Sequence, residues 1–187
     1  AEEKGVLLVH AAGNDGSNND SVPNFPNPDF LDSTKATNFI TVGASSTGKG
    51  NEKVASFSNY GKKGVDLFAP GVQIYSTIPG GNKYGSASGT SMASPVVAGV
   101  AALVLSYYPE LSARQLKYVL EKSATPLPDS VSEVNKPGTS DEKVNFADLS
   151  VTGGLVNSYE AIKLAATLNG ENVKSKSKKP HNAKVKA

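Results

Sequence analysis

Residues 89–105 read GTSMASPVVAGVAALVL, and this stretch decides the fold class. A flexible segment rich in Gly and Ser precedes it. Pro95 is tolerated in a first helical turn because its missing N–H would have no helical partner there. The residues that follow are apolar around the whole circumference of a helix and include several Ala and Gly. Such a helix packs inside a protein, so we expect a buried central helix that starts close to Ser91.

Short apolar segments before this helix predict the strands of a parallel sheet. Residues 6–9 (VLLV) form a continuous apolar run, which is typical of a strand covered on both faces. Further strands are expected at 39–44, 54–58, 65–69 and 73–77. Two helices should follow, one with a capping box of Ser112 and Gln115 and one beginning near Asn157. This succession predicts an α/β protein with a mostly parallel sheet.

The ends of the chain differ from its middle. Residues 3–5 (EKG) look like the end of a helix that has no beginning, and a buried strand at 6–9 needs neighbours, so we expect the chain to begin within a fold. Residues 171–187 contain six lysines against one acid and almost no large apolar residues. We therefore divide the chain into a partial domain at 1–170 and a Lys-rich, disordered tail at 171–187. No aromatic residue lies between the lysines, so nucleic-acid binding is not expected.

The composition excludes several classes of site. The 187 residues contain no Cys, which excludes a disulfide scaffold, thiolate zinc sites and a cysteine nucleophile. Two histidines leave little room for His-based metal chemistry. No run of 18 apolar residues is present, so no membrane-spanning helix is expected.

Ser91 is a candidate nucleophile. A serine in the first turn of a buried helix can present its hydroxyl to a cleft, and its own N–H is one of the unpaired donors of that helix. Nucleophile and half of an oxyanion hole would then share one residue. The alternative is that Ser91 or Thr90 only caps the helix, and helix physics alone does not decide between the two.

The residue string adds a resemblance. GTSMASP at 89–95 is similar, at all seven positions, to the nucleophile motif of the subtilisin-like serine proteases, the subtilases. The similarity continues in the same order through VLLVHAAGN at 6–14, ASFSNYG at 55–61, DLFAPGV at 66–72 and GGLVN at 153–157. It covers about residues 5–168, with an insertion near 125–150. It implies the C-terminal part of a subtilisin-like three-layer fold, with its buried central helix starting at the nucleophile.

The resemblance implies a role for each matching residue in a serine endopeptidase. Ser91 would attack the scissile carbonyl, and the Asn14 amide with the Ser91 N–H would hold the oxyanion. Thr90 would support them with its hydroxyl. Ala11, Ala12 and Gly13 would form one wall of the pocket for the side chain before the cleaved bond. Asn14 can also be an ordinary turn residue in GNDG at 13–16, and both interpretations can hold together.

The catalytic base is the part that this sequence does not supply. The family order of Asp, His and Ser places an Asp and a His before Asn14. His10 is the only histidine there, and it lies at a strand position where the family has an ordinary residue, so we do not expect it to be the base. An N-terminal half of the catalytic domain would supply both residues, and the chain alone would be inactive. An unpaired strand edge at 6–9 would join that half or a second copy.

Two other functions stay open. The order Ser91, Asp148, His181 fits that of nucleophile, acid and base in α/β-hydrolases, although those enzymes have Gly-x-Ser-x-Gly at the nucleophile. The chain could also be a non-catalytic binding module on a degenerate protease fold, which would have no need of Ser91 and Asn14.

Cofactor and location follow from the family alone. No cofactor is required, and calcium enters only as a structural ion. Residues 15–20 (DGSNND) are rich in oxygen ligands, but their spacing fits no defined calcium loop, so no metal site is predicted there. The resemblance implies a protein that is secreted or held in the cell envelope and acts on peptides or proteins.

Overall fold

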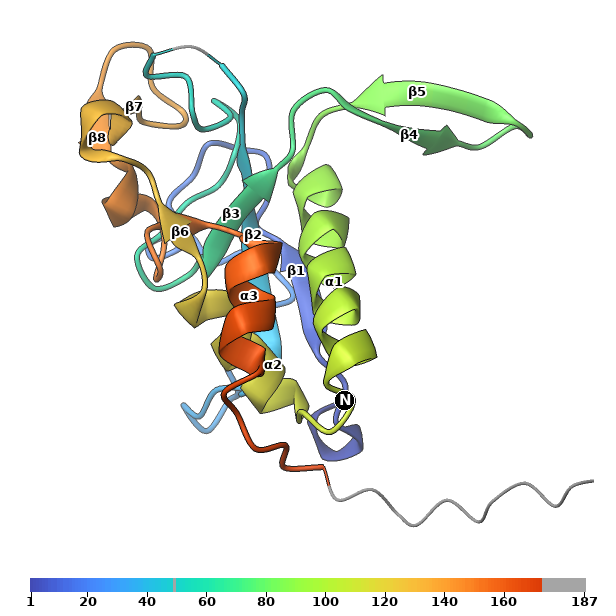
Figure 1. Ribbon diagram of the computed structural model, residues 1–187. Coiled ribbons are helices and arrows are strands. Elements are labelled where there is room, and N and C mark those ends of the chain that lie inside the picture. The colour runs from blue at the N-terminus through green and yellow to red at the C-terminus, as the bar shows by residue number, and fades with distance from the viewer. Residues whose placement is uncertain (49, 173–187) are drawn as a thin grey trace, which may run out of the picture.

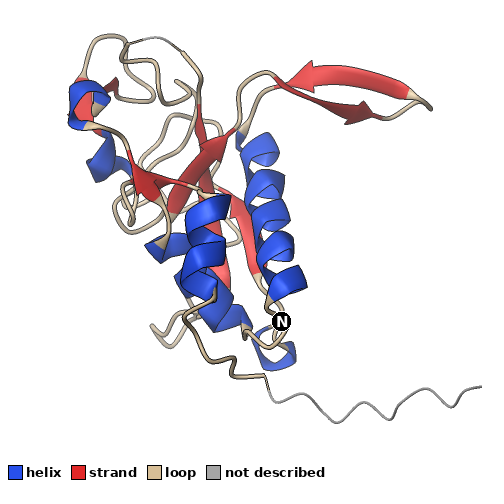
Figure 2. Cartoon of the chain, in the orientation of Figure 1, coloured by secondary structure: helices blue, strands red, loops and turns tan. Residues whose placement is uncertain are grey.

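The computed structural model describes residues 1–48 and 50–172, which form an α/β fold around one mostly parallel sheet (Figures 1 and 2). The strands lie in the order β1, β2, β3, β9, β6, of which the first four are parallel and β6 is antiparallel. The sheet consists of β1 Leu8–Ala11, β2 Phe39–Ser45, β3 Leu67–Pro70, β9 Gly154–Leu155 and β6 Thr125–Pro126. Within the described ranges β1 pairs only with β2, so its other edge is open.

Three layers result from the alternation of side chains along the strands. On one face, Leu67 and Ala69 of β3 pack in a first core cluster with the three helices. On the other face, Phe68 packs in a second core cluster with Phe146 and Leu149. The helices are α1 Thr90–Tyr107, α2 Ala113–Lys122 and α3 Ser158–Ala165. The sheet is thus covered on both sides, as its continuous apolar strands require.

Helix α1 lies against β1, β2, β3 and α3, as the central helix of the fold. Its buried residues are Thr90, Ala93, Val97, Ala101 and Val104. The opposite face, with Ala98, Gly99, Ala102 and Leu103, is exposed among the described residues. The expectation of a helix packed on all sides is therefore met on one face only.

Helix α1 contradicts the expectation that the sequence contains no helix apolar enough to span a membrane. By length and composition alone, Thr90–Tyr107 is apolar enough to cross a membrane, with a mean hydropathy of 1.5. The expectation from run length missed this because small residues and Ser are interspersed with Val and Leu. In the structure, α1 contacts the sheet as the core helix of an α/β fold does.

The other predicted helices begin where the sequence places them. Ser112 and Gln115 form the capping box of α2, each side chain bonded to the backbone of the other. Asn157 caps α3 by accepting a hydrogen bond from the Glu160 N–H. Glu171 and Asn172, assigned to the tail by composition, bond to Ser112 and Leu111 respectively. The rest of the Lys-rich segment, with His181, lies outside the described residues.

Two local predictions are wrong. Residues 54–58 do not form a strand: a single bridge joins Val54 to Ser45, and the chain then turns, with Ser58 N–H donating to the Ala55 carbonyl. The segment before the nucleophile is a strand instead of a flexible loop. It is β5 Lys83–Ala87, which pairs with β4 Ile74–Ile78 in a hairpin that projects from the body (Figure 1). Tyr75 stacks on Tyr84 and stabilises this hairpin. The hairpin was not predicted because polar and apolar residues alternate only weakly along its two strands.

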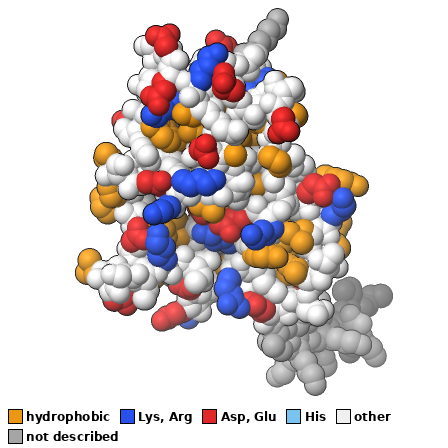
Figure 3. Space-filling view, turned by 90° about the vertical axis from the view of Figure 1, so that its left-hand side faces the viewer, with side chains coloured by type: hydrophobic (Ala, Val, Ile, Leu, Met, Phe, Trp, Pro, Cys, Tyr) orange, Lys and Arg blue, Asp and Glu red, His pale blue; other side chains and the backbone are white. Residues whose placement is uncertain are grey.

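Residues 125–150, which had no predicted role, are structured. After β6 come the short 3-10 helix η2 Asp129–Val131, the hairpin of β7 Glu133–Asn135 and β8 Lys143–Asn145, and η3 Phe146–Leu149. This hairpin lies at the upper left of Figure 1. The face of the molecule on that side carries interspersed acidic and basic side chains (Figure 3). Two ion pairs, Lys136–Glu142 and Lys143–Glu133, belong to the hairpin.

One charged cluster joins α2 to the sheet. Lys117 Nζ donates to the Phe39 carbonyl over 2.6 Å, and it lies 3.2 Å from Asp66 and 3.4 Å from Glu121. Burial raises the pKa of the Glu121 carboxyl to about 7, against the opposing charge of Lys117, and nearby Asp66 raises it further. Glu121 therefore takes up a proton on folding at mildly acidic pH.

This proton uptake predicts how stability depends on pH. The unfolded carboxyl has a pKa of about 4.5, so stability contributed by protonated Glu121 is complete below that value and is lost as pH rises through about 7. We expect Glu121→Gln to flatten the fall in melting temperature between pH 5 and pH 8. Glu160→Gln, which removes an exposed ion pair with Lys163, is the matched control and should leave the slope unchanged. Equal slopes in Glu121→Gln and the parent would contradict the assignment.

Candidate active site

The candidate nucleophile lies where the parallel strands end. Ser91 is the second residue of α1, and its side chain is exposed. The Gly89 N–H donates to the Gly71 carbonyl over 2.8 Å, which places the start of α1 beside the end of β3. The turn that carries Asn14 follows β1 at the same edge. The carboxyl edge of a parallel sheet is where α/β proteins place their ligands.

Thr90 holds the Asn14 side chain in one orientation. The Asn14 Oδ1 atom accepts hydrogen bonds from the Thr90 N–H at 2.9 Å and from the Thr90 hydroxyl at 3.0 Å. The same hydroxyl accepts the Gly13 N–H at 3.2 Å. Thr90 is completely buried, whereas Asn14 is exposed. Because both donors bind the amide oxygen, the amide nitrogen is left free to donate elsewhere.

Two N–H donors border one small space beside Gly89. A Cβ atom built on Gly89 would lie 3.5 Å from Asn14 Nδ2, 3.6 Å from Met92 Sδ and 3.7 Å from the Ser91 nitrogen. No acceptor for the Ser91 N–H occurs within the part of the chain that the structure describes. Preorganised donors around one position, next to a serine hydroxyl, are what a tetrahedral oxyanion requires.

The side chain of Asn59 stabilises the turn at 13–17 through hydrogen bonds to its backbone. This buried side chain accepts hydrogen bonds from the Asp15 N–H at 2.9 Å and from the Ser17 N–H at 3.0 Å. The backbone N–H of Asn59 donates to the Gly13 carbonyl. Asn59 occurs in the string ASFSNYG at 55–61, and no role was predicted for it. No local pattern marks it, because its partners at Asp15 and Ser17 lie more than 40 positions earlier in the chain.

The three small residues at the end of β1 have different surroundings. Ala12 is completely buried in the second core cluster, whereas Ala11 and Gly13 are half-buried. The Ala12 carbonyl accepts the side-chain amides of Asn19 at 3.0 Å and Asn24 at 2.7 Å. The Ala12 N–H donates to the Val42 carbonyl at 2.9 Å, so both backbone groups of this buried residue are already bonded within the chain. Their role as a pocket wall stays a prediction.

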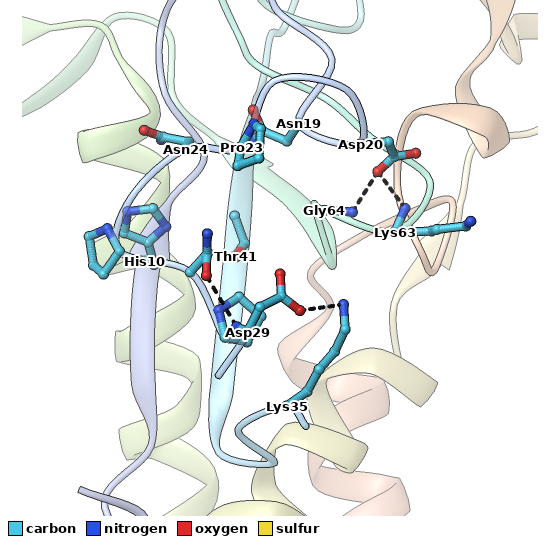
Figure 4. A pocket seen from close by; sticks show the side chains of 13 residues that line it. His10, Asn19, Asp20, Pro23, Asn24, Asp29, Lys35, Thr41, Lys63 and Gly64 are labelled. Carbon is cyan, nitrogen blue, oxygen red and sulfur yellow. Dashed lines mark hydrogen bonds and ion pairs between the residues drawn. The ribbon is translucent and has the colours of Figure 1, made fainter. Parts of the chain in front are cut away.

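His10 points away from Ser91. Its neighbour Val9 packs in the first core cluster beside α1, so the alternation of β1 turns His10 to the other face. There it borders a cavity of about 210 Å³ together with Asn24 and Lys35 (Figure 4). Burial lowers the pKa of His10, which favours the neutral ring. The structure does not bring this histidine to the nucleophile.

The alternative hydrolase constellation is not assembled among the described residues. Asp148 lies on η3, which packs through Phe146 and Leu149 on the sheet face away from α1. His181 lies outside the described residues.

The oxygen-rich segment 15–20 uses its side chains within the chain. Asp20 Oδ1 accepts the N–H groups of Lys63 and Gly64, at 2.9 Å and 2.8 Å. Asn18 Oδ1 accepts the Asp20 N–H, and Asn19 Oδ1 accepts the Asn59 amide. These oxygens therefore do not form a free ligand cage, and no cluster of three acidic or histidine ligands occurs at 1–48 or 50–172. A structural calcium ion stays a prediction.

Comparison with known proteins gives a consistent result. A family model described as "Subtilase family" matches residues 1–158. Subtilisin DY of Bacillus licheniformis is 45% identical over 131 residues, which are 70% of this chain and 43% of that protein. Alkaline elastase YaB of a Bacillus species is 43% identical over 127 residues, 68% of this chain and 30% of that protein. The chain thus spans less than half the length of these relatives.

Solved structures agree with the sequence comparison. A protease from Pseudoalteromonas arctica superimposes with a TM-score of 0.61 at 26% identity, over 88% of this chain and 44% of that one. The patellamide maturation protease PatA superimposes with a TM-score of 0.60 at 28% identity, over 89% and 54% respectively.

The Asn59 bonds predict a local effect on the Asn14 turn. Asn59→Ala would leave two backbone amides without their acceptor, at a cost of about 1–3 kcal/mol. We expect faster hydrogen exchange at Asp15 and Ser17 and a lower melting temperature. Asn157→Ala removes the cap of α3 at a similar cost of about 1 kcal/mol and is the control, because it should not change exchange at 15 and 17. Unchanged exchange at the turn in Asn59→Ala would contradict this account.

Proposed function

The chain belongs to the subtilase family, and we propose that it is the part of a subtilisin-type serine endopeptidase that carries the nucleophile and the oxyanion hole. The observation that carries the proposal is the small space bordered by Asn14 Nδ2 and the Ser91 nitrogen, beside the exposed Ser91 hydroxyl. Relatives named as subtilisins and an elastase support a peptide bond as the bond that is cleaved.

The proposed chemistry is acyl transfer in two steps. Ser91 Oγ attacks the carbonyl carbon of the scissile peptide while a base takes its proton, and the carbonyl oxygen becomes an oxyanion. The intermediate collapses to an acyl-enzyme and releases the amine, which receives that proton. Water then attacks the ester by the same route and regenerates the serine.

The oxyanion would accept hydrogen bonds from Asn14 Nδ2 and the Ser91 N–H. Thr90 is a positioning residue in this proposal, because its two bonds to Asn14 Oδ1 aim the amide nitrogen at the common space. Donors that are already oriented need no reorganisation as charge develops, which is the source of their effect.

The base and its partner aspartate would come from a further segment that pairs with β1. His10 faces away from Ser91, so it is a poor candidate for the base. The open edge of β1 can accept another strand, since no described strand pairs with that side and only the Ser94 hydroxyl donates there, to the Val9 carbonyl at 3.3 Å. The exposed face of α1 lies next to this edge and offers small and apolar residues, Ala98, Gly99, Ala102 and Leu103, to the same segment.

The remaining elements of the proposal rest on the family. Substrates would be peptides or proteins, no cofactor would take part in the chemistry, and the protein would act outside the cell or in its envelope. A non-catalytic binding role has no observation in its favour, because the site retains both an accessible serine and the oriented amide.

Labelling with a fluorophosphonate probe tests the nucleophile. We expect the chain assembled with the segment that carries the Asp and His motifs to react, and Ser91→Ala to abolish the reaction. Ser106→Ala, at an exposed serine near the other end of α1, is the control. Labelling that persists in Ser91→Ala would refute the nucleophile. Labelling of the isolated chain that depends on Ser91 would refute the need for the additional segment.

Peptide turnover by the same assembly tests the oxyanion donor. Asn14→Asp keeps an oxygen for the bonds from Thr90 but replaces the amide donor. Removal of such a donor from a subtilisin lowers turnover by about 10²–10³-fold, and that measured value, not one derived from this geometry, sets our expectation. We expect kcat to fall by this order with little change in KM. An unchanged kcat would exclude Asn14 from the oxyanion hole.

A further inference from the structure

The stretch at 125–150 interrupts the resemblance to the subtilases, and part of it reaches the turn at 13–17. We define the arm as residues 133–145, which comprise β7, its connection and β8 (Figure 1). The base of the arm belongs to the body of the protein, because Val134 is completely buried in the second core cluster. Ala12, immediately before the turn, is buried in the same cluster. The arm and the start of the turn therefore share one apolar core.

Two glycines bring the connection of the arm against the turn. The Gly138 N–H donates to the Ser56 carbonyl at 2.9 Å. The Gly16 N–H donates to the next carbonyl, that of Phe57, at 2.8 Å. A Cβ atom on Gly138 would lie 2.4 Å from the Gly16 carbonyl oxygen, and a Cβ atom on Gly16 would lie 2.5 Å from the Gly138 Cα. The two backbones are thus in direct contact, at a distance that leaves no room for a side chain on either residue.

The contact with the arm limits the position of Gly16 within the turn. The neighbouring amides of Asp15 and Ser17 both donate to the Asn59 side chain, and these bonds fix the turn on either side of Gly16 in the sequence. Within residues 1–48 and 50–172, however, no group donates a hydrogen bond to the Gly16 carbonyl. Packing against Gly138 is therefore what restricts this carbonyl, which lies only two residues after Asn14.

We propose that the arm positions the oxyanion donor, and that it acts through the contact between Gly138 and Gly16. This inference rests on the proposed function. The Asn14 amide would stabilise developing charge only if it is already oriented. Thr90 orients the Asn14 side chain, and the arm restricts the backbone that carries it. Gly138 is a positioning residue, so its loss should lower kcat and leave KM nearly unchanged.

Gly138→Ala tests the contact in the chain assembled with the segment that supplies the Asp and His motifs. The new Cβ atom would lie 2.4 Å from the Gly16 oxygen, whereas real Cβ contacts are essentially never shorter than 3.0 Å. The arm and the turn must therefore separate. Because a misplacement on the order of 1 Å can cost about 100-fold in rate, we expect kcat for a peptide substrate to fall about tenfold.

Gly81→Ala is the matched control, because it introduces the same backbone strain without the contact. Gly81 has a φ of +70°, close to the +76° of Gly138. A Cβ atom on Gly81 would meet no described atom within 4 Å beyond its chain neighbours. Both substitutions should lower the melting temperature, since alanine is unfavourable at positive φ. Only Gly138→Ala should lower kcat.

A double-mutant cycle with Asn14→Asp shows whether the arm acts through the oxyanion donor. Where the donor is already lost, its displacement should cost little. Gly138→Ala should therefore lower kcat less than about twofold in the Asn14→Asp background, against about tenfold in the parent. A general loss of stability would lower kcat by the same factor in both backgrounds.

A loop variant provides a second test in case Gly138→Ala does not fold. Residues 136–142 are replaced by Asn-Gly, which favours a two-residue turn between Asn135 and Lys143, the pair that ends the ladder of β7 and β8. Val134 keeps its place in the core cluster, whereas the contact with Gly16 is removed. We expect kcat to fall by a factor similar to that of Gly138→Ala, again with little change in KM.

The outcomes separate this inference from the proposed function. Absence of peptide turnover by the parent assembly would overturn the proposed function, and the role of the arm with it. Turnover by the parent with an unchanged kcat in Gly138→Ala or in the loop variant would overturn the role of the arm alone. A fall in kcat that Gly81→Ala reproduces, or that is equally large in the Asn14→Asp background, would do the same.

Discussion

The hydrogen bonds from Thr90 to the Asn14 amide oxygen are the interaction on which the site depends. They join residues that are 76 positions apart in the chain, one in the turn after β1 and one at the start of α1. Every larger feature serves to bring these residues together. The parallel pairing of β1, β2 and β3 aligns the strand ends, and the packing of α1 on the sheet brings its first turn to the same edge.

Burial makes this interaction effective. Thr90 is completely enclosed, so its N–H and hydroxyl have no water to replace Asn14 as acceptor. Asn59 does the same for the turn itself, since it accepts two backbone amides from within. The exposed groups of the site, Ser91 and Asn14, are therefore carried by backbone segments whose polar groups are hydrogen-bonded within the chain. This combination is what preorganisation means for a group that must meet developing charge.

The sequence predicted the parts of the structure that follow from short-range physics. The apolar run at 96–105, the capping box at Ser112 and the cap at Asn157 each specify a local conformation, and each appears in the structure. The string GTSMASP located the nucleophile only through resemblance, because a serine in a first turn is otherwise indistinguishable from a cap. The hairpin before the nucleophile was not predicted because its two strands alternate only weakly. The role of Asn59 and the approach of residues 133–145 to Gly16 were not predicted because they depend on contacts between distant segments.

The absence of a side chain at Gly89 has a consequence for how this sequence can vary. A Cβ atom there would meet ordinary van der Waals neighbours, the nearest at 3.5 Å, so the surrounding atoms alone would leave room for alanine. In the proposed reaction, however, that space is where the oxygen of the substrate becomes charged. The substrate oxygen, which is present only during turnover, would then exclude a side chain at position 89. The backbone restricts the same position independently, because the φ of +157° at Gly89 is a conformation that residues with a side chain rarely adopt.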